Sequence, residues 1–201
     1  MKTILALALV ISTSAFAQTG TTTKEQTTTY QVDTQKSKIN WVGKKVTGQH
    51  NGTINVKSGN LIFKGAELTG GEIIVDMTSL VVSDLANDKA TADKFIGHMK
   101  SPDFFNTEAH PESKLVIKST KKSGNDLEVN GNLTLIGKTQ PITFKVNDWK
   151  WTDKLVTGKV KLNLDRTKWG LKYGSGQFFK GLGDKMIDDE FNLDIDLTAT
   201  R

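Results

Sequence analysis

Side chains that could carry out covalent or metal chemistry are few in this sequence of 201 residues. There is no cysteine, which excludes a thiol nucleophile and a thiolate metal site. The three histidines, His50, His98 and His110, do not stand at the H-x-x-x-H spacing that places two imidazoles on one helix face. No serine stands in a G-x-S-x-G nucleophile elbow. We therefore predict no catalytic residue, no metal site and no cofactor.

Two short motifs resemble functional sites only in part. Gly174-Ser175-Gly176 is similar to a fragment of a phosphate-binding loop, but it lacks the full spacing and the strand-to-helix context. Asp188-Asp189-Glu190 is an acidic cluster at the start of a predicted strand, where solvated carboxylates discourage pairing between strand edges. We interpret the first motif as part of a flexible loop and the second as a solvated strand end.

The charge pattern argues against a nucleic-acid partner. Lysine and arginine number 27 against 22 aspartates and glutamates. The basic residues are dispersed along polar strand faces, whereas a nucleic-acid binder shows a dense basic stripe with interleaved aromatic residues. The pattern favours a soluble, lysine-decorated surface.

A glycine-rich segment from Asp165 to Asp184 contains five glycines and four aromatic residues, Trp169, Tyr173, Phe178 and Phe179. Aromatic side chains left in water are unfavourable, so we expect them to fold over apolar surface. They either plug one end of the core or form the mouth of a ligand cavity, and composition alone favours the plug.

The elements that must position these residues are mostly strands with one apolar face. Between residues 127 and 146, apolar residues occupy every second position on both sides of a turn at 137–140, which indicates a β-hairpin. Gly131 falls on the buried face, where a missing side chain marks a bend or the close approach of another backbone. A denser apolar run at 72–82 predicts burial on both faces for part of its length.

One segment, Asp88 to Lys100, departs from the strand pattern. Its apolar residues recur at three- and four-residue spacing, which predicts a helix with Asn87 or Asp88 as N-cap. Roughly eight one-sided strands and one helix can close as a sandwich or as a barrel. Periodicity does not separate these two folds.

The N-terminus is expected to lie outside the fold. Residues 1–17 combine a positive Lys2, an apolar run at 4–11 and the small-x-small pattern Ala15-Phe16-Ala17, which predicts a signal peptide cleaved after Ala17. Residues 18–29 are threonine-rich and predicted to be a flexible leader, and residues 30–201 form one domain. The mature chain is therefore expected in the periplasm or outside the cell.

Five motifs, in this order, resemble those of the YceI-like, polyisoprenoid-binding family of bacterial proteins. They are Tyr30-Gln31-Val32-Asp33 with Ser37-Lys38-Ile39-Asn40-Trp41, Gly48-Gln49-His50-Asn51-Gly52, Ser101-Pro102-Asp103-Phe104-Phe105 with His110-Pro111, Gly131-Asn132-Leu133-Thr134-Leu135-Ile136-Gly137 with Pro141-Ile142, and Asp165-Arg166-Thr167-Lys168-Trp169-Gly170-Leu171. The resemblance spans the chain from Tyr30 onward. One departure is Lys36, which stands where many members of the family have a histidine.

The resemblance implies an all-β fold, an extended antiparallel lipocalin-like β-barrel of about eight strands with one capping helix. It also implies an apolar pore that holds an isoprenoid lipid, such as a quinone or a polyprenyl lipid, so that the protein acts as a carrier or store. A homodimer and transient contact with a membrane are further expectations. The resemblance shifts the interpretation of the aromatic loop toward a cavity mouth.

The candidate ligand-binding residues are those of inward parity, one residue of the helix and those of the aromatic loop. They are Ile54, Val56, Phe63, Phe95, Leu115, Ile117, Leu133, Leu135, Ile142, Phe144, Val160, Leu162, Arg166, Trp169, Tyr173, Phe178, Phe179, Phe191 and Leu193. Arg166 or Lys172 would meet a polar head group, although an ion pair with Asp165 or another carboxylate explains Arg166 equally well. Parity identifies the inward face and not the pore, so some of these residues belong to an ordinary core.

Two other functions stay open from the sequence. An enzyme acting on a lipid in the same cavity would need a titratable group beside the head group, and His50 or His98 would be the first to test. A solid barrel that binds another protein would have its interior filled by its own side chains.

Overall fold

The structure is a computed structural model that describes residues 26–201. The predicted signal peptide and most of the predicted leader lie outside these residues. The strands are β1 (Thr27–Val32), β2 (Lys38–Lys45), β3 (Gly48–Lys64), β4 (Glu67–Val82), β5 (Glu112–Ser123), β6 (Asp126–Leu135), β7 (Lys138–Trp151), β8 (Leu155–Asp165) and β9 (Ile187–Thr200). The helices are α1 (Lys89–Lys100) and two 3-10 turns, η1 (Arg166–Trp169) and η2 (Gly183–Lys185). Because β1 begins at Thr27, the barrel starts three residues before the predicted boundary at Tyr30.

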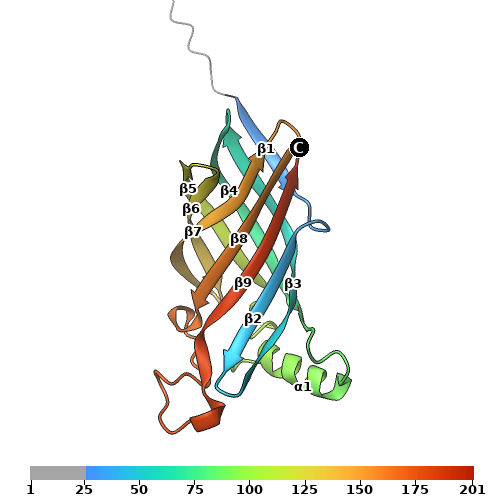
Figure 1. Cartoon of the computed structure of the whole chain (residues 1–201), viewed down its shortest axis with the longest axis vertical. Coiled ribbons are helices and arrows are strands. Elements are labelled where there is room, and N and C mark those ends of the chain that lie inside the picture. Colours follow the sequence, from blue (N-terminus) through green and yellow to red (C-terminus); the bar gives the residue numbers. More distant parts are fainter. Residues whose placement is uncertain (1–25) are drawn as a thin grey trace, which may run out of the picture.

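The strands form one closed antiparallel barrel (Figure 1). Each strand from β3 to β9 pairs with the next, and β2 links β9 back to β3. Alternation of apolar and polar residues lets each strand bury one face inside the barrel and leave the other in water. The predicted barrel of about eight strands with one α-helix is confirmed, and the sandwich is excluded.

Strands β1 and β2 occupy one position of the barrel, end to end between β3 and β9. β1 pairs with residues 60–64 of β3 and with the last residues of β9, whereas β2 pairs with residues 48–54 of β3 and with the first part of β9. The turn between them is fastened to β9, because the Ser37 hydroxyl donates to the Thr198 carbonyl and accepts from the Thr198 N–H, both at 3.1 Å. Nine strands therefore give eight positions around the barrel.

Gly131 lies where β5 and β6 come close, as predicted. A Cβ at this position would lie 2.8 Å from the Val116 carbonyl oxygen and 3.0 Å from Leu115 Cδ1. The β5–β6 register shifts between Ile117 and Ser119, directly opposite this glycine. The missing side chain thus permits a bulge that helps the sheet to curve.

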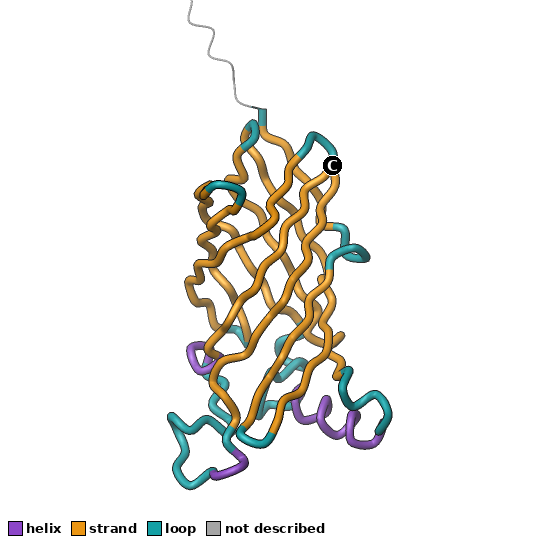
Figure 2. The backbone as a smooth tube through the Cα atoms, viewed as in Figure 1, coloured by secondary structure: helices purple, strands orange, loops and turns teal. Residues whose placement is uncertain are grey.

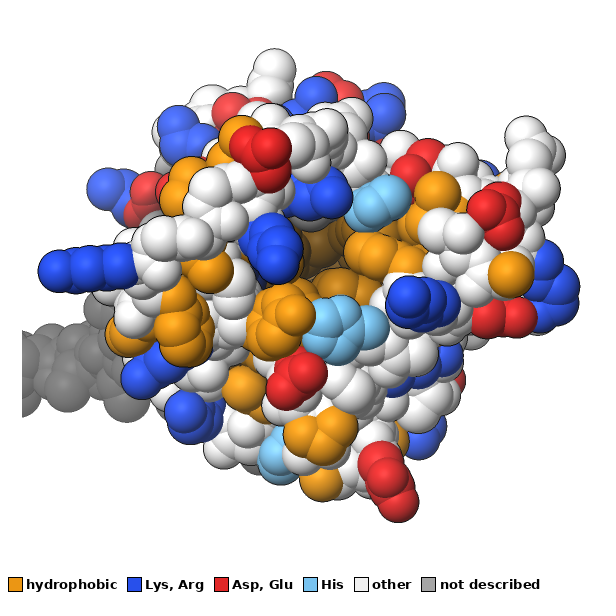
Figure 3. All heavy atoms as spheres, turned by 90° about the horizontal axis from the view of Figure 1, so that it is seen from below, with side chains coloured by type: hydrophobic (Ala, Val, Ile, Leu, Met, Phe, Trp, Pro, Cys, Tyr) orange, Lys and Arg blue, Asp and Glu red, His pale blue; other side chains and the backbone are white. Residues whose placement is uncertain are grey.

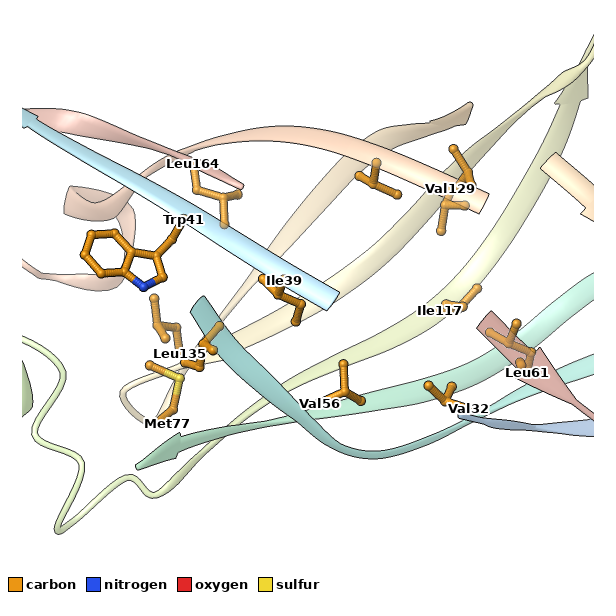
Figure 4. Close-up of a cluster of buried hydrophobic side chains, with 14 of the residues drawn as sticks. Val32, Ile39, Trp41, Val56, Leu61, Met77, Ile117, Val129, Leu135 and Leu164 are labelled. Atoms are coloured by element: carbon orange, nitrogen blue, oxygen red, sulfur yellow. The ribbon is translucent and has the colours of Figure 1, made fainter. Parts of the chain in front are cut away.

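One half of the barrel is filled by its own side chains. Phe63 is fully buried, and its ring centroid lies 5.0 Å from that of Tyr30, 6.3 Å from that of Trp149 and 5.9 Å from that of Trp151. The Tyr30 hydroxyl donates to the Thr152 carbonyl at 2.9 Å. We call Tyr30, Phe63, Trp149 and Trp151 the aromatic plug. The labelled apolar side chains of Figure 4 continue along the interior, from Leu61 and Val32 on one side of the view to Trp41 on the other.

A bulge in β7 brings two of the plug residues inside. The register between β7 and β8 shifts between Asn147 and Lys150, and Asp148 has a positive φ of 51°. One extra residue reverses the parity, so the inward side chains change from Phe144 and Val146 to Trp149 and Trp151. A strict alternation across this point would have placed both tryptophans outside.

Helix α1 lies at one side of the opposite end of the barrel (Figure 2). Asp88 is its N-cap, because the carboxylate accepts from the Thr91 N–H at 3.1 Å, and this confirms the predicted helix start. Phe95, Ile96 and Met99 pack from the helix against the core. Across residues 26–201, no helix is long and apolar enough to cross a membrane.

The predicted burial of both faces for part of the segment 72–82 is met only by half-buried residues at 72–76, and it fails towards the end of the strand. Val81 is 49% exposed, and the strand is irregular near residues 76–79, where the Thr78 N–H donates to the Asp76 carboxylate and the Ser79 hydroxyl donates to the Asp76 carbonyl. Between residues 72 and 77 the inward residues are odd-numbered, as Val75 and Met77 are, and after the irregularity they are even-numbered, as Leu80 and Val82 are. A parity change within one strand looks like a continuous apolar run in the sequence.

Candidate functional site

The half of the barrel away from the aromatic plug contains a cavity of about 520 Å³. This volume is in the range of pockets that bind small molecules. No plug residue lines the cavity, so the cavity ends before it reaches the aromatic plug. At the other end it opens between α1, the β2–β3 turn and the loop before β9, where an apolar hollow is visible (Figure 3).

Fourteen of the nineteen predicted ligand-binding residues line this cavity. They are Ile54, Val56, Phe95, Leu115, Leu133, Leu135, Ile142, Phe144, Val160, Leu162, Arg166, Tyr173, Phe191 and Leu193. Most are inward residues of β3 and β5–β9, because the period of two places alternate side chains on the interior. Whether they bind a ligand stays a prediction.

Several lining residues were missed by the sequence analysis. They are, among others, Ile39, Trp41, Ile73, Val75, Met77, Leu80, Met99, Phe104, Phe105, Leu164, Leu171, Ile187, Ile195 and Leu197. The period of two in β2, β8 and β9 could have identified Ile39, Trp41, Leu164, Ile195 and Leu197, which share the parity of the other inward residues of their strands. The residues of β4 were hidden by its change of parity, and no periodic signal marks the loop that follows α1.

Phe63 and Ile117 face inward but do not line the cavity. Both are buried at the level where the barrel is solid. Phe63 belongs to the aromatic plug, and Ile117 lies next to the narrow β5–β6 approach at Gly131. Parity predicted their direction correctly, but the side chains that fill the space around them come from other strands and from the β7 bulge.

The four aromatic residues of the glycine-rich loop have three different environments. Trp169 is buried and its indole N–H donates to the Leu133 carbonyl at 3.0 Å, so it closes the core, as the plug interpretation predicted. Tyr173 lines the cavity near its opening. Phe178 and Phe179 are 43% and 49% exposed and do not line the cavity. The loop therefore closes part of the core with Trp169, lines the mouth with Tyr173 and exposes Phe178 and Phe179.

Arg166 has no hydrogen-bond donor left for a head group. Its side chain is 6% exposed, and its nitrogens donate to the carbonyls of Leu171, Tyr173, Ile187 and Asp188 at 2.8–3.1 Å and to an Asp189 carboxylate oxygen at 3.3 Å. A guanidinium has five N–H donors, and five acceptors are present. Burial lowers the pKa of Arg166, while the carboxylate of Asp189 raises it. Of the two interpretations left open, the structural ion pair is confirmed, although its partner is Asp189 and not Asp165. The residue fastens the glycine-rich loop to β9.

His50 stands at the rim on the β3 side. Its Nδ1 lies 2.7 Å from an Asp84 carboxylate oxygen, and its ring lies 4.5 Å from that of Phe95. The other Asp84 oxygen accepts from the Asn51 N–H at 2.8 Å. Burial acts to raise the pKa of Asp84, but these hydrogen bonds outweigh it and the pKa is lower than usual. The carboxylate thus ties β3 to the segment that leads into α1.

His98 connects α1 to the glycine-rich loop across the rim. Its ring packs edge-on against Tyr173, with centroids 4.8 Å apart, and against Phe104 at 5.0 Å. Its Nε2 lies 3.3 Å from an Asp103 carboxylate oxygen. Within residues 26–201, neither the His50 nor the His98 imidazole forms a hydrogen bond with a serine or threonine hydroxyl. The arrangement therefore resembles structural contacts more than an activated nucleophile.

The interior of the cavity is apolar and its rim is polar. Among the described residues, the only buried side-chain polar atom without a partner is Trp151 Nε1, which belongs to the plug and not to the cavity. Buried Ser113, which does line it, donates to the Thr134 carbonyl at 2.9 Å. Charged residues line the opening, namely Lys44, Lys45, Asp184, Lys185, Asp188 and Glu190. The described residues contain no group of three side chains that could hold a metal ion. Such a cavity can hold an apolar tail and leave a polar head at the rim.

Sequence comparison places the chain among known families. A family model described as the YceI-like domain matches residues 30–199. "Protein YceI" of Escherichia coli O17:K52:H18 is 32% identical over 99 residues, which cover 45% of this chain and 48% of that protein. The chain thus spans about half the length of the curated relatives it matches.

Solved structures share the fold. The structure of Burkholderia cenocepacia BcnA has a TM-score of 0.61 at 23% identity, over 83% of this chain and 98% of that one. A polyisoprenoid binding domain from Saccharophagus degradans, implicated in plant cell wall breakdown, has a TM-score of 0.59 at 17% identity, over 85% and 97% of the two chains. At these identities the likeness concerns the architecture.

Proposed function

The chain belongs to the YceI-like family, and from this premise we propose that it is a lipid-binding protein that holds an isoprenoid chain in its barrel. The observation that carries the proposal is the apolar cavity of about 520 Å³, which ends before the aromatic plug and is rimmed by polar residues. The polyisoprenoid binding domain of similar fold supports the choice of ligand.

The physical basis is the transfer of hydrocarbon from water to the cavity. Each buried CH₂ contributes about 0.8 kcal/mol, so an isoprenoid tail gains several kcal/mol without any specific polar contact. The cavity walls have their own polar groups paired, so they offer a tail only apolar contacts. An amphipathic ligand such as a quinone or polyprenyl lipid would enter tail first, and its head would stay between the rim lysines and histidines.

The proposed role is that of a carrier or store. It includes export, supported by the signal-peptide pattern at residues 1–17, because a lipid with a long apolar tail needs a carrier in an aqueous compartment. The N-terminal sequence of the protein from its host tests this part: a start at Gln18 is expected. The homodimer is still a prediction, and sedimentation analysis of the purified protein would test it.

Mass spectrometry of the organic extract tests the ligand. The protein is purified from its host without detergent and its lipids are extracted. A stoichiometric isoprenoid species is the expected result and would identify the ligand. A stoichiometric fatty acid or phospholipid would keep lipid binding but overturn the isoprenoid assignment. A clean extract, with no binding of added isoprenoid quinone, would overturn the proposal and favour a protein partner.

A further inference from the structure

We propose that the open end of the barrel docks on the surface of an anionic lipid bilayer. The docking surface, called the mouth patch, consists of apolar Val46, Tyr173, Phe178, Phe179 and Met186 and of Lys44, Lys45, Lys172, Lys180 and Lys185. The inference rests on the proposed function for its purpose, since a carrier must exchange lipid with a membrane. Its geometry comes mainly from side chains that do not line the cavity, namely Val46, Lys172, Phe178, Phe179, Lys180 and Met186.

Exposed large hydrophobic side chains are concentrated at this end of the molecule. Residues 26–201 contain seven of them, and five belong to the mouth patch. The other two, Val81 and Leu155, stand singly on β4 and at the start of β8. Single exposed apolar residues are normal on protein surfaces, whereas a cluster of them marks a site of interaction.

The mouth patch is continuous although its residues come from two segments. The Val46 N–H donates to the Met186 carbonyl at 3.2 Å, and Lys45 pairs with Ile187 in the sheet. The segment between η1 and η2 projects beyond the end of the barrel at the bottom of Figure 1. Apolar and basic side chains are seen together on that face in Figure 3.

The two phenylalanines are held in place while exposed. The backbone N–H groups of Phe178 and Phe179 donate to the carbonyl of fully buried Ser175, at 3.2 and 3.0 Å. Arg166 holds the start of the same loop through the Tyr173 carbonyl. Lys172 lies over the Phe178 ring, with its Nζ 4.5 Å from the ring centroid. The loop therefore presents aromatic rings and ammonium groups in a fixed arrangement.

The charge of the mouth patch favours a bilayer that contains anionic lipid. Segments 43–50 and 171–187 contain five lysines and one aspartate, and none of these lysines forms an ion pair within the described part of the chain. Asp188 and Glu190 line the same rim, but the lysines still outnumber the carboxylates. Each lysine near an anionic surface increases binding about fivefold, and aromatic side chains insert at the level of the head groups.

Continuity with the cavity distinguishes a bilayer from other partners. Lys44, Lys45, Tyr173 and Lys185 belong both to the mouth patch and to the cavity lining. When the mouth patch lies on the head groups, the opening faces the bilayer. A lipid can then move between bilayer and cavity without exposing its tail to water, whereas docking on a protein surface that has no apolar cavity of its own would not allow this.

Vesicle flotation tests the mouth patch. The purified full chain is mixed with vesicles of phosphatidylcholine alone or of phosphatidylcholine with phosphatidylglycerol, and the bound fraction is measured at low and high salt. The test variants are Phe178→Ser/Phe179→Ser and Lys172→Gln/Lys180→Gln, none of which lines the cavity. Matched controls at the opposite end are Leu155→Ser and Lys121→Gln/Lys122→Gln, which are also exposed.

The expected outcome is that wild type floats with phosphatidylglycerol vesicles and less at high salt. The phenylalanine variant should lose at least ~10-fold in binding to the anionic vesicles. The lysine variant should lose roughly 25-fold there, and its preference for anionic lipid should weaken without disappearing, because Lys44, Lys45 and Lys185 remain. The Leu155 and Lys121/Lys122 controls should bind like wild type.

Binding of an isoprenoid quinone in solution, without vesicles, separates this inference from the proposed function. All variants should bind it as wild type does, because none of the substituted residues lines the cavity and Lys172, although predicted from the sequence as a head-group contact, lies over the Phe178 ring. Quinone binding without flotation, or equal flotation of test and control variants, would overturn docking by the mouth patch and leave the ligand proposal intact. Flotation without quinone binding would overturn the ligand proposal and leave the docking surface.

Discussion

Arg166 was a candidate for contact with a ligand head group, and the structure gives it another role that can be tested. Replacing it by methionine keeps an apolar side chain of similar length but removes all five donors. Of its five hydrogen bonds, the one to the Leu171 carbonyl is buried and the other four are partly buried. The loss should therefore appear in the free energy of unfolding before it appears in ligand binding.

The size of this loss follows from the bonds. A hydrogen bond to a charged group contributes about 1.5–3 kcal/mol, and an ordinary one about 0.5–1.5 kcal/mol. If the buried bond contributes about 1.5–3 kcal/mol and each of the other four contributes about 0.5 kcal/mol, the total loss is roughly 3.5–5 kcal/mol. This agrees with the about 3–5 kcal/mol lost when one partner of a buried ion pair is removed. The melting temperature should fall by roughly 10 °C.

Urea unfolding, followed by tryptophan fluorescence, measures the effect, and quinone binding is measured on the same samples. Arg166→Lys keeps the charge and three donors, so it should lose about half as much stability. Asp189→Asn removes only the half-exposed charge partner and should cost about 1 kcal/mol or less. If Arg166→Met unfolds at the wild-type urea concentration but no longer retains quinone, Arg166 contacts the ligand and its assignment as a structural residue is wrong.

Three further predictions concern the cavity and its supports. Phe144→Asp should weaken quinone binding by at least ~100-fold, because a carboxylate would be buried against the tail, whereas the outward Thr143→Asp should bind normally in the same titration. Gly52→Ala should lower the free energy of unfolding by about 1–3 kcal/mol in urea, because a Cβ there would overlap the Val81 carbonyl oxygen. The pKa of Asp84 in the folded protein is below its usual value, so its contribution is present above pH ~4 and is lost as the pH falls through the folded-state pKa. The stability difference between wild type and Asp84→Asn should therefore shrink in acid unfolding curves below that pH.

Each of these has an outcome that contradicts it. Retention of quinone by Phe144→Asp at wild-type affinity would mean that the tail does not occupy the cavity. Gly43→Ala is the control for Gly52, since nothing lies within 4 Å of a Cβ at Gly43, and equal losses in the two variants would exclude a steric cause. An Asp84→Asn difference that stays constant with pH would show that the carboxylate is not stabilised by its hydrogen bonds.

The strands could be predicted from the sequence because the alternation of apolar and polar residues depends only on residues that are neighbours in the chain. The hairpin at 127–146 shows this, since its inward residues, its turn and the close approach at Gly131 all follow from residue types at fixed spacing. The helix start at Asp88 was predictable for the same reason. Family motifs then decided between sandwich and barrel, which alternation alone does not distinguish.

The limits of the cavity were not predictable, because they depend on residues far apart in the sequence. Phe63 faces inward as Val56 does, yet Phe63 meets Trp149 and Trp151, which a single bulged residue turns inward. Phe178 and Phe179 were expected to cover apolar surface, but the loop that carries them is held by Arg166 and Ser175 so that they face outward. Neither the bulge nor the loop leaves a periodic signal.

The aromatic plug also determines how cargo would exchange. With one end of the barrel solid, an arriving lipid and a departing lipid must use the same opening, and the second can enter only after the first has left. Exchange should then follow the kinetics of a single-file, dissociative process, in which the rate is set by departure and does not rise with the concentration of the incoming lipid. A barrel open at both ends would instead let a new tail push the old one out.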